Sequence, residues 1–514
     1  MKNNLSLFCK SRLAIIFILI GLDSLASGQA TMGIFEQHGD IGDCSLEGSL
    51  EYRTDDQVYY LAGSGENMWF DKDQFHFAWK KLSGDFIIRA RVEFIGQGVN
   101  AHRKMGLMIR SSLGTDVSHV NGVVHGDGLT SIQFRREQGG MTEEIISSAR
   151  SPEILQLERR GRQYILSTAQ AGEPFDTIAF ADLDLGNEVY AGLFICSHDN
   201  NVMEKARFSN VRIIIPASED FIPYKDYLGS NLEVLDLETG IRKVIHRSPL
   251  SLQAPNWSPD GRYLVYNSEG LLYRFDLESG IPAVIPSGFA SSNNNDHVIS
   301  FDGKKLGISH HAEEDDGRSI IYTIPIEGGT PERITEEGPS YLHGWSPDGE
   351  YLTYTAERNG EFDIYKSSVK KKEEIRLTDA PDLDDGSEYS PDGKYIYFNS
   401  NRTGSMKIWR MHPDGSHQEQ ITFDEYNDWF PHISPDGRWM VFLSYQKEVR
   451  SDDHPFYKQV YLRKLPVSGG TPEIIAYVYG GQGSINVPSW SPDSKKIAFI
   501  SNSDMKQFKN MQKD

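Results

Sequence analysis

The sequence has few cysteines and no long apolar run. Its 514 residues contain three cysteines, Cys9, Cys44 and Cys196, too few for a fold built on disulfides. No stretch of about 18 apolar residues occurs, which excludes a membrane-spanning helix. With 47 glycines and 23 prolines, collagen-like and low-complexity sequence are excluded as well. The remaining composition is that of a globular protein, and its length suggests two to three domains.

Basic residues are in the minority. The chain has 52 Lys and Arg against 73 Asp and Glu, a net charge of −21. A surface of this sign repels phosphate, which argues against general binding to nucleic acid or to an anionic membrane. Neutral and cationic ligands remain open.

Familiar catalytic motifs are also absent. The sequence has no Gly-x-Ser-x-Gly, P-loop, His-Glu-x-x-His or Cys-x-x-Cys. The acidic run at residues 382–386 does not follow the EF-hand pattern. We interpret this run as a solvated turn, with a calcium-binding loop as the alternative.

The first 30 residues are typical of a secretory signal peptide. A positive segment with Lys2, Lys10 and Arg12 precedes an apolar run at residues 13–22, and small residues lie at 28–30. We therefore predict a signal peptide over 1–30 and a periplasmic or secreted protein.

Export leaves two cysteines in the mature chain. Because an exported protein meets an oxidising compartment, Cys44 and Cys196 can pair there. Two buried free thiols are the alternative, and the sequence does not separate the two cases.

The second half of the chain repeats a Ser-Pro-Asp-Gly motif. The aspartates of successive copies are 42, 46, 44, 44 and 57 residues apart, a period typical of an array of one structural unit. Each copy is followed by period-two alternation, as at residues 395–398, and by further short strands. Four short strands per repeat predict a propeller blade. The six copies occupy residues 258–261, 300–303, 346–349, 390–393, 434–437 and 491–494.

The ends of the repeat region complement each other. Residues 231–236 and 243–245 read as the third and fourth strands of a blade, and residues 496–500 read as a second strand. We therefore predict a six-bladed β-propeller over 230–505, closed by both ends of the region, with a tail at 506–514. Closure hides the sheet edges that an open array would expose.

These motifs resemble the TolB-type six-bladed propeller. The resemblance rests on the repeats, on "YFNSNRTGSMKIWRMHPDG" at 397–415 and on "RLT" at 376–378. It implies the propeller fold, which serves elsewhere as a binding hub, a peptidase gate or a lyase scaffold. TolB proteins carry a small α/β domain before the propeller, and a different domain stands here. This departure argues against a direct Tol–Pal partnership.

Residues 31–215 show strand-like segments and no repeat, which predicts a β-sandwich, joined to the propeller by a linker at 216–229. The segments "GDFIIRARVEF", "KMGLMIRSS" and "YAGLFICSHD" resemble a concanavalin-like or laminin-G-like sandwich, which implies glycan binding. Five aromatic residues lie close together and form either a sugar-stacking platform or part of an ordinary core. They are Trp69, Phe70, Phe75, Phe77 and Trp79.

Histidines concentrate in the loops that are expected to rim the propeller channel. Glu388 occupies the position equivalent to His432 in the preceding blade, and a long insertion at 445–459 brings His454 into the fifth blade. Long loops on a rigid scaffold are often functional. The six histidines of these loops are His297, His310, His311, His343, His432 and His454.

Two interpretations of this funnel remain open. In the first, His343 and His432 bind a divalent metal (Mn, Zn or Ca), and Glu388 and His454 act as acid and base. The residue types and blade positions resemble the His-rich metal centre of propeller oligogalacturonate lyases. In the second, the histidines only hydrogen-bond loops around the channel. We expect three further residues to bind ligand at the rim: Arg402, Trp429 and Tyr457.

The sequence thus predicts an all-β protein, an N-terminal β-sandwich followed by a six-bladed propeller. Its expected function is to bind a glycan or a cell-envelope protein through the channel face. The alternative function is a metal-assisted polysaccharide lyase or hydrolase.

Overall fold

The computed structural model describes residues 31–180 and 182–506. The predicted signal peptide and residues 507–514 of the predicted tail lie outside this part of the chain. Within it, the named elements are 37 β-strands and one short 3-10 helix, so the predicted all-β class is confirmed. No helix in the described ranges is long and apolar enough to cross a membrane.

The N-terminal strands form two antiparallel seven-stranded sheets. The first has the order β1 (Gln37–Ile41), β4 (Phe75–Ser83), β13 (Glu188–Cys196), β6 (Lys104–Arg110), β7 (His119–His125), β8 (Thr130–Arg135) and β9 (Glu143–Ile146). The second has the order β12 (Asp176–Phe180), β11 (Gln163–Ala169), β10 (Ile154–Arg160), β5 (Phe86–Ile95), β14 (Glu204–Ile214), β3 (Val58–Gly63) and β2 (Ser49–Arg53).

One hydrophobic core joins these two sheets into a sandwich-like region. Leu107 and Ile109 of β6 pack in the same cluster as Leu155 and Leu157 of β10, and all four are fully buried. Alternate residues of β6, namely Met105, Leu107 and Ile109, enter this core, as the period-two geometry of a strand in a two-layer fold requires.

Three of the five clustered aromatic residues belong to a smaller core. Phe75, Phe77 and Trp79 of β4 are buried and pack with Met68. Phe70 is 53% exposed. The core interpretation therefore holds for three of the five aromatic residues, which are unable to stack on a sugar.

Cys44 and Cys196 are both free thiols.

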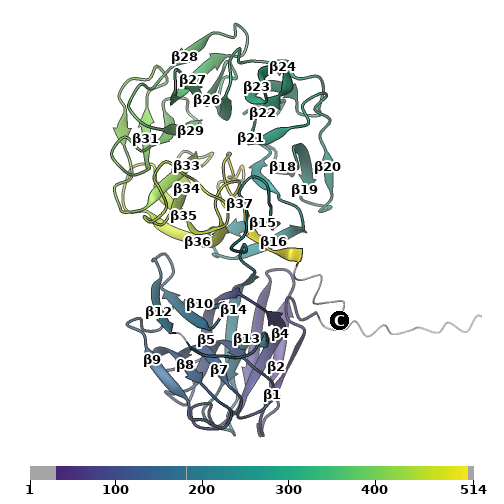
Figure 1. Ribbon diagram of the computed structural model, residues 1–514, viewed down its shortest axis with the longest axis vertical. Coiled ribbons are helices and arrows are strands. Elements are labelled where there is room, and N and C mark those ends of the chain that lie inside the picture. The colour runs from purple at the N-terminus through teal and green to yellow at the C-terminus, as the bar shows by residue number, and fades with distance from the viewer. Residues whose placement is uncertain (1–30, 181, 507–514) are drawn as a thin grey trace, which may run out of the picture. The chain divides into compact units, whose positions relative to one another are not determined.

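The remaining strands form six sheets arranged in a ring, the six-bladed propeller that the repeats predict (Figure 1). Five blades have four strands each. The first blade consists of β17 (Gln253–Trp257), β18 (Tyr263–Ser268), β19 (Leu271–Asp276) and β20 (Pro282–Val284), and the second of β21 (Asn293–Ile299), β22 (Lys305–Ala312), β23 (Arg318–Pro325) and β24 (Glu332–Arg333). The third consists of β25 (Ser340–Trp345), β26 (Tyr351–Arg358), β27 (Glu361–Ser368) and β28 (Glu374–Arg376), and the fourth of β29 (Asp384–Tyr389), β30 (Ile396–Ser400), β31 (Lys407–Met411) and β32 (Glu419–Gln420). The fifth consists of β33 (Asn427–Ile433), β34 (Trp439–Tyr445), β35 (Lys458–Pro466) and β36 (Glu473–Gly480). The 3-10 helix η1 (Glu313–Asp315) connects β22 to β23.

The sixth blade is closed by both ends of the propeller region. β37 (Lys496–Ser503) pairs antiparallel with β15 (Gly229–Asp236), which pairs with β16 (Arg242–Ser248). The pairing of β15 with β37 runs from Gly229↔Ser503 to Asp236↔Lys496, and Trp490 adds a single bridge to Ile497. This closure agrees with the prediction from the complementary ends.

The repeated motif is a self-contained turn between the first two strands of each blade. In the third blade, Ser346 Oγ donates to Asp348 Oδ1 at 2.5 Å and accepts a hydrogen bond from the Tyr351 backbone N–H at 2.9 Å. Gly349 follows with φ +72°, a conformation that glycine adopts without steric cost. The same Ser–Asp hydrogen bond occurs in all six copies, which explains why the motif recurs.

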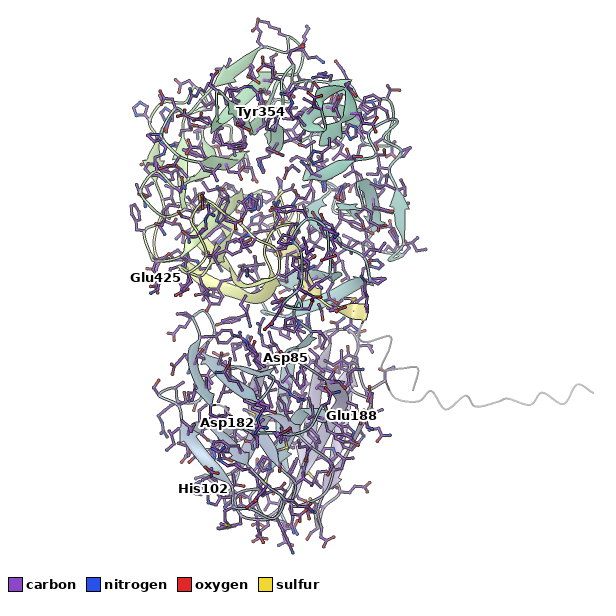
Figure 2. All side chains as sticks on the ribbon, viewed as in Figure 1. Asp85, His102, Asp182, Glu188, Tyr354 and Glu425 are labelled. Carbon is purple, nitrogen blue, oxygen red and sulfur yellow. The ribbon has the colours of Figure 1, made fainter. Side chains whose placement is uncertain are left out.

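Polar pairs also attach the outer strands of a blade to its centre. Tyr354 of β26, labelled in Figure 2, is fully buried and donates a hydrogen bond to Glu374 Oε2 of β28 at 2.7 Å. The short outer strand is thereby fixed by a side chain as well as by its ladder.

Candidate functional site

A large cavity lies in the propeller at the blade ends opposite the Ser–Asp turns. The register of β21 with β22 defines the two ends: Ile299↔Leu306 is next to the turn, whereas Asn293↔His310 is at the other end. The cavity has a volume of about 1610 Å³ and takes its lining from the second end of several blades. Its polar and aromatic side chains include Asn293, Asn295, Asp296, Tyr341, His343 and Asp385.

Irregular inner strands aim these side chains. The pairing of the first strand with the second is interrupted by a register shift in each four-stranded blade, as between Asp385 and Glu388 in β29. Such bulges re-aim side chains and are frequent near functional sites. In β33 the bulge contains Phe430 at φ +56°, an uncommon conformation for an aromatic residue.

Asp385 collects donors from several elements. Its Oδ1 accepts hydrogen bonds from Thr355 Oγ1 and from the backbone N–H of Gly386, both at 2.7 Å. His343 Nε2 lies 3.0 Å from Oδ1, and His454 Nε2 lies 3.8 Å from Oδ2. Burial alone raises the pKa of Asp385, but the charge and hydrogen bond of His343 outweigh it and lower the pKa to about 2. Asp385 is therefore a satisfied carboxylate.

His343 shares this ion pair and is held by an aromatic neighbour. Burial lowers its pKa, but the charge of Asp385 and the hydrogen bond to it outweigh burial, so the pKa of His343 is raised. Its ring stacks on Phe430 with centroids 6.0 Å apart. The imidazole therefore carries positive charge next to the Asp385 carboxylate at a higher pH than free histidine does.

Asp296 of β21 is the opposite case. It lines the cavity and is 6% exposed, and its carboxylate accepts no hydrogen bond from any described residue. Burial raises its pKa to about 7, and the small opposing effect of His343 does not restore the ordinary value. The same cavity thus holds one satisfied and one unsatisfied carboxylate.

Sequence reasoning missed both carboxylates. Asp385 lies in the acidic run that we interpreted as a solvated turn, and in the structure it is a buried residue of β29. Asp296 directly precedes His297, and the sequence pattern indicated only the histidine as a candidate. No sequence signal identifies them, because both lie at inner-strand bulges that only the strand pairing reveals.

The four residues of the predicted metal and acid–base centre divide into two groups. His343 and His454 line the cavity, and both face Asp385. Glu388 and His432 form a separate buried pair, with His432 Nδ1 2.5 Å from Glu388 Oε2. The second nitrogen of His432 contacts the Ile485 carbonyl, and Glu388 Oε1 accepts the backbone N–H of Ile433 at 3.1 Å. Neither Glu388 nor His432 lines the cavity.

The other histidines of the channel loops are divided as well. His311 lines the cavity, whereas His297 is fully buried, with its Nε2 3.2 Å from the Val265 carbonyl. His310 is also buried, at 6% exposure, and lies beside Tyr322.

The three residues predicted to bind ligand at the rim lie elsewhere. Arg402 pairs with Asp384 Oδ2 at 2.7 Å, inside the fourth blade. Trp429 is fully buried against His454, and Tyr457 is 5% exposed and accepts a hydrogen bond from the Leu228 backbone N–H at 3.0 Å. None of the three lines the cavity. The aromatic side chains that line it include Tyr224, Tyr227, Tyr341, Phe362, Phe430 and Phe456.

The residues present do not fit the metal centre that the lyase resemblance implies. No group of three or more His, Cys, Asp or Glu side chains in the described part of the chain is arranged to hold a metal ion. Both ring nitrogens of His432 already have protein partners. We therefore derive no chemistry through a metal at this site.

Comparison with known proteins identifies the repeat region. The TolB beta propeller domain family matches residues 341–460, which contain all but the first residue of the third blade, the whole fourth blade and part of the fifth. An uncharacterized protein of Agrobacterium fabrum is 47% identical over 272 residues, which cover 53% of this chain and 92% of that protein.

Two further relatives carry TolB names. A solved structure from Agrobacterium tumefaciens, provisionally assigned as a TolB, is 46% identical; the match covers 54% of this chain and 99% of that one, with a TM-score of 0.52. The Tol-Pal system protein TolB of Francisella tularensis is 27% identical over 149 residues, 29% of this chain and 32% of that protein.

Proposed function

This chain belongs to the TolB-like β-propeller family, and from that premise we propose that it is an exported binding protein that holds a segment of a cell-envelope protein in the propeller cavity. A glycan is the competing ligand for the same cavity.

The cavity is the observation that carries the proposal. Its volume of about 1610 Å³ exceeds the roughly 300–1,000 Å³ of ordinary small-molecule pockets, so it has room for several residues of an extended segment. Its lining mixes aromatic rings with amide and carboxylate groups, which suits a peptide backbone and its side chains.

The relatives favour a protein ligand over a glycan. A relative named for the Tol-Pal system points to partners in the cell envelope. Three of the aromatic residues that could have formed a sugar-stacking platform in the N-terminal region are buried, so the glycan alternative rests on the cavity alone. We do not extend the Tol–Pal partnership itself to this chain, because two seven-stranded sheets precede its propeller instead of the small α/β domain of TolB proteins.

Site-specific photo-crosslinking in living cells tests the proposal. We would replace Phe362, which lines the cavity, with p-benzoylphenylalanine, and make the same replacement at Phe301 as the matched control. Phe301 is 43% exposed and lies in the Ser–Asp turn at the other end of its blade. We expect one envelope protein to be cross-linked from position 362 and not from position 301.

Two results would contradict the proposal. Equal cross-linking from both positions would mean that the cavity does not select the partner. No cross-link from position 362, together with binding on a glycan array that the cavity replacement abolishes, would make a glycan the ligand.

A further inference from the structure

We propose that the part of the cavity around Asp296 is a subsite for one basic side chain, a lysine ammonium or an arginine guanidinium, with Asp296 as its counter-charge. This inference rests on the proposed function, because it names the chemistry of the segment that the cavity holds.

The state of Asp296 carries the inference. Its side chain lines the cavity at 6% exposure, and within the described residues its carboxylate accepts no hydrogen bond. An ionised carboxylate that is 6% exposed and has no protein donor is costly, because it has lost most of its hydration and gained no hydrogen bond in exchange. A cationic group of a ligand supplies both the missing donor and the missing charge.

The neighbouring carboxylate does not compete for this role. Asp385 already accepts hydrogen bonds from Thr355 and Gly386 and faces His343 and His454. The pKa of His343 is raised, so its imidazolium supplies a positive charge that balances the negative charge of Asp385. A ligand cation therefore gains more at Asp296 than at Asp385.

The charge of the cavity points the same way. Its lining contains five carboxylates and two basic side chains outside the histidines. One of the two basic groups, Arg450, is already paired with Asp452 at 2.6 Å. The field in the cavity thus attracts cations and repels anionic ligands. The carboxylates are Glu269, Asp296, Asp382, Asp385 and Asp452, and the basic residues are Arg450 and Lys506.

The surroundings of Asp296 fit a long basic side chain. Tyr224 and Tyr341 line the cavity, and the hydroxyl groups of both interact electrostatically with Asp296. Tyr224 is 64% exposed, whereas Asp296 is buried. A lysine or arginine can lay its methylene groups on the aromatic rings and bring its charged end to the carboxylate.

The subsite predicts a pH dependence in a defined direction. The pKa of Asp296 is about 7, so the carboxylate becomes ionised as the pH rises through that value. We expect cation affinity to rise about tenfold between roughly pH 6 and pH 8. The other titratable groups that interact with Asp296 are His343, Asp385, Tyr224 and Tyr341. Of these, His343 also loses positive charge as the pH rises, so a variant must separate the two.

Ligand-observed NMR on the mature chain tests the subsite with small probes. We would use N-acetyl-lysine methylamide, its neutral isostere N-acetyl-norleucine methylamide, and glucosamine as an amino sugar. The wild type is expected to bind the lysine probe at least about tenfold more tightly than the norleucine probe. Asp296→Asn is expected to remove this preference and to flatten the pH profile. The control Asp379→Asn removes the same charge from an exposed residue outside the cavity lining and is expected to keep both.

Each other result overturns the inference in a recognisable way. No preference for lysine in the wild type, or a preference that survives Asp296→Asn, removes Asp296 from the subsite. A pH profile that persists in Asp296→Asn assigns the titration to His343. Tighter binding of glucosamine than of the lysine probe replaces the protein side chain with an amino sugar. The cross-linking at position 362 does not use these probes, so the two experiments can fail separately. A cross-link from position 362 without a preference for the lysine probe overturns the subsite alone. A preference for the lysine probe without a cross-link from position 362 overturns the proposed function.

Discussion

At the scale of single residues, two aspartates in one cavity have opposite electrostatic states because their neighbours differ. Asp385 has hydrogen-bond donors on Oδ1 and the charge of His343 beside it, and its pKa falls to about 2. Asp296 has burial without donors, and its pKa rises to about 7. Groups with such separated pKa values cluster at functional sites, although structural ion pairs also produce them.

The raised pKa of Asp296 makes stability depend on pH. Its pKa in the unfolded chain is near 3.8, so the folded protein holds a proton that the unfolded chain releases between about pH 4 and pH 7. The free energy of unfolding therefore falls across this window. We expect Asp296→Asn to be more stable than the wild type by roughly 4 kcal/mol at about pH 8, and equal to it below about pH 4.

Chemical denaturation of both proteins at the two pH values measures this difference. Asp382→Asn serves as the control, because Asp382 is exposed and its change leaves the difference near zero. Equal stability of Asp296→Asn and wild type at the higher pH would mean that the carboxylate finds a partner in solution.

The buried Glu388–His432 pair is expected to stabilise the fold. Removal of either side chain leaves the other as an unpaired buried polar group. We expect Glu388→Ala and His432→Ala each to lower the free energy of unfolding by about 3 kcal/mol and to leave binding in the cavity unchanged. Urea denaturation and the lysine-probe assay measure the two effects. A variant that loses binding at unchanged stability would return His432 to the metal-binding role and Glu388 to the acid–base role predicted from the sequence.

At the scale of strands and turns, the sequence predicts what is encoded locally. The Ser–Asp turn needs only a few consecutive residues, so six copies identify six blades without any knowledge of tertiary contacts. The complementary ends likewise predict the pairing of β15 with β37.

Side-chain direction in the inner strands is different. Each four-stranded blade has a register shift in its first strand, after which strict alternation no longer identifies the channel-facing residues. Trp429 precedes the bulge of β33 and is buried, whereas Phe430 within it lines the cavity. Period-two reasoning cannot distinguish these neighbours, because the bulge depends on packing between blades.

Closure of the sixth blade yields a prediction at this scale. Ile497 and Phe499 of β37 are fully buried and pack in one cluster with Leu235 of β15. Deletion of residues 485–514 removes β37, exposes the edge of β15 and opens this core. We expect the propeller to lose more than about 10 °C in Tm.

Thermal unfolding followed by circular dichroism measures the loss. The matched control deletes only residues 507–514, which leaves β37 complete. An unchanged Tm for the longer deletion would contradict closure by both chain ends, and a lowered Tm for the shorter one would mean that the tail contributes to the fold.

At the scale of the whole molecule, the acidic charge and the proposed ligand agree. The chain carries a net charge of −21, and the cavity lining is acidic as well. Long-range attraction between the protein and a basic segment accelerates their encounter and is screened by salt. From the sequence, only the negative net charge favours a basic ligand. The carboxylate that we propose to bind it, Asp296, is recognised by its missing hydrogen bond, which the sequence does not show.

The last prediction concerns export, which the proposed function requires. A protein that binds an envelope partner must reach the envelope, and residues 1–30 have the charged segment, apolar run and small residues of a secretory signal. We expect the exported protein to begin near Thr31, as read by N-terminal sequencing of a periplasmic or secreted fraction. A chain started at Thr31 behind a new Met is expected to stay in the cytoplasm and to give no cross-link from position 362. Retention of residues 1–30 on a soluble cytoplasmic product, or the cross-link without the leader, would contradict export as a condition of function.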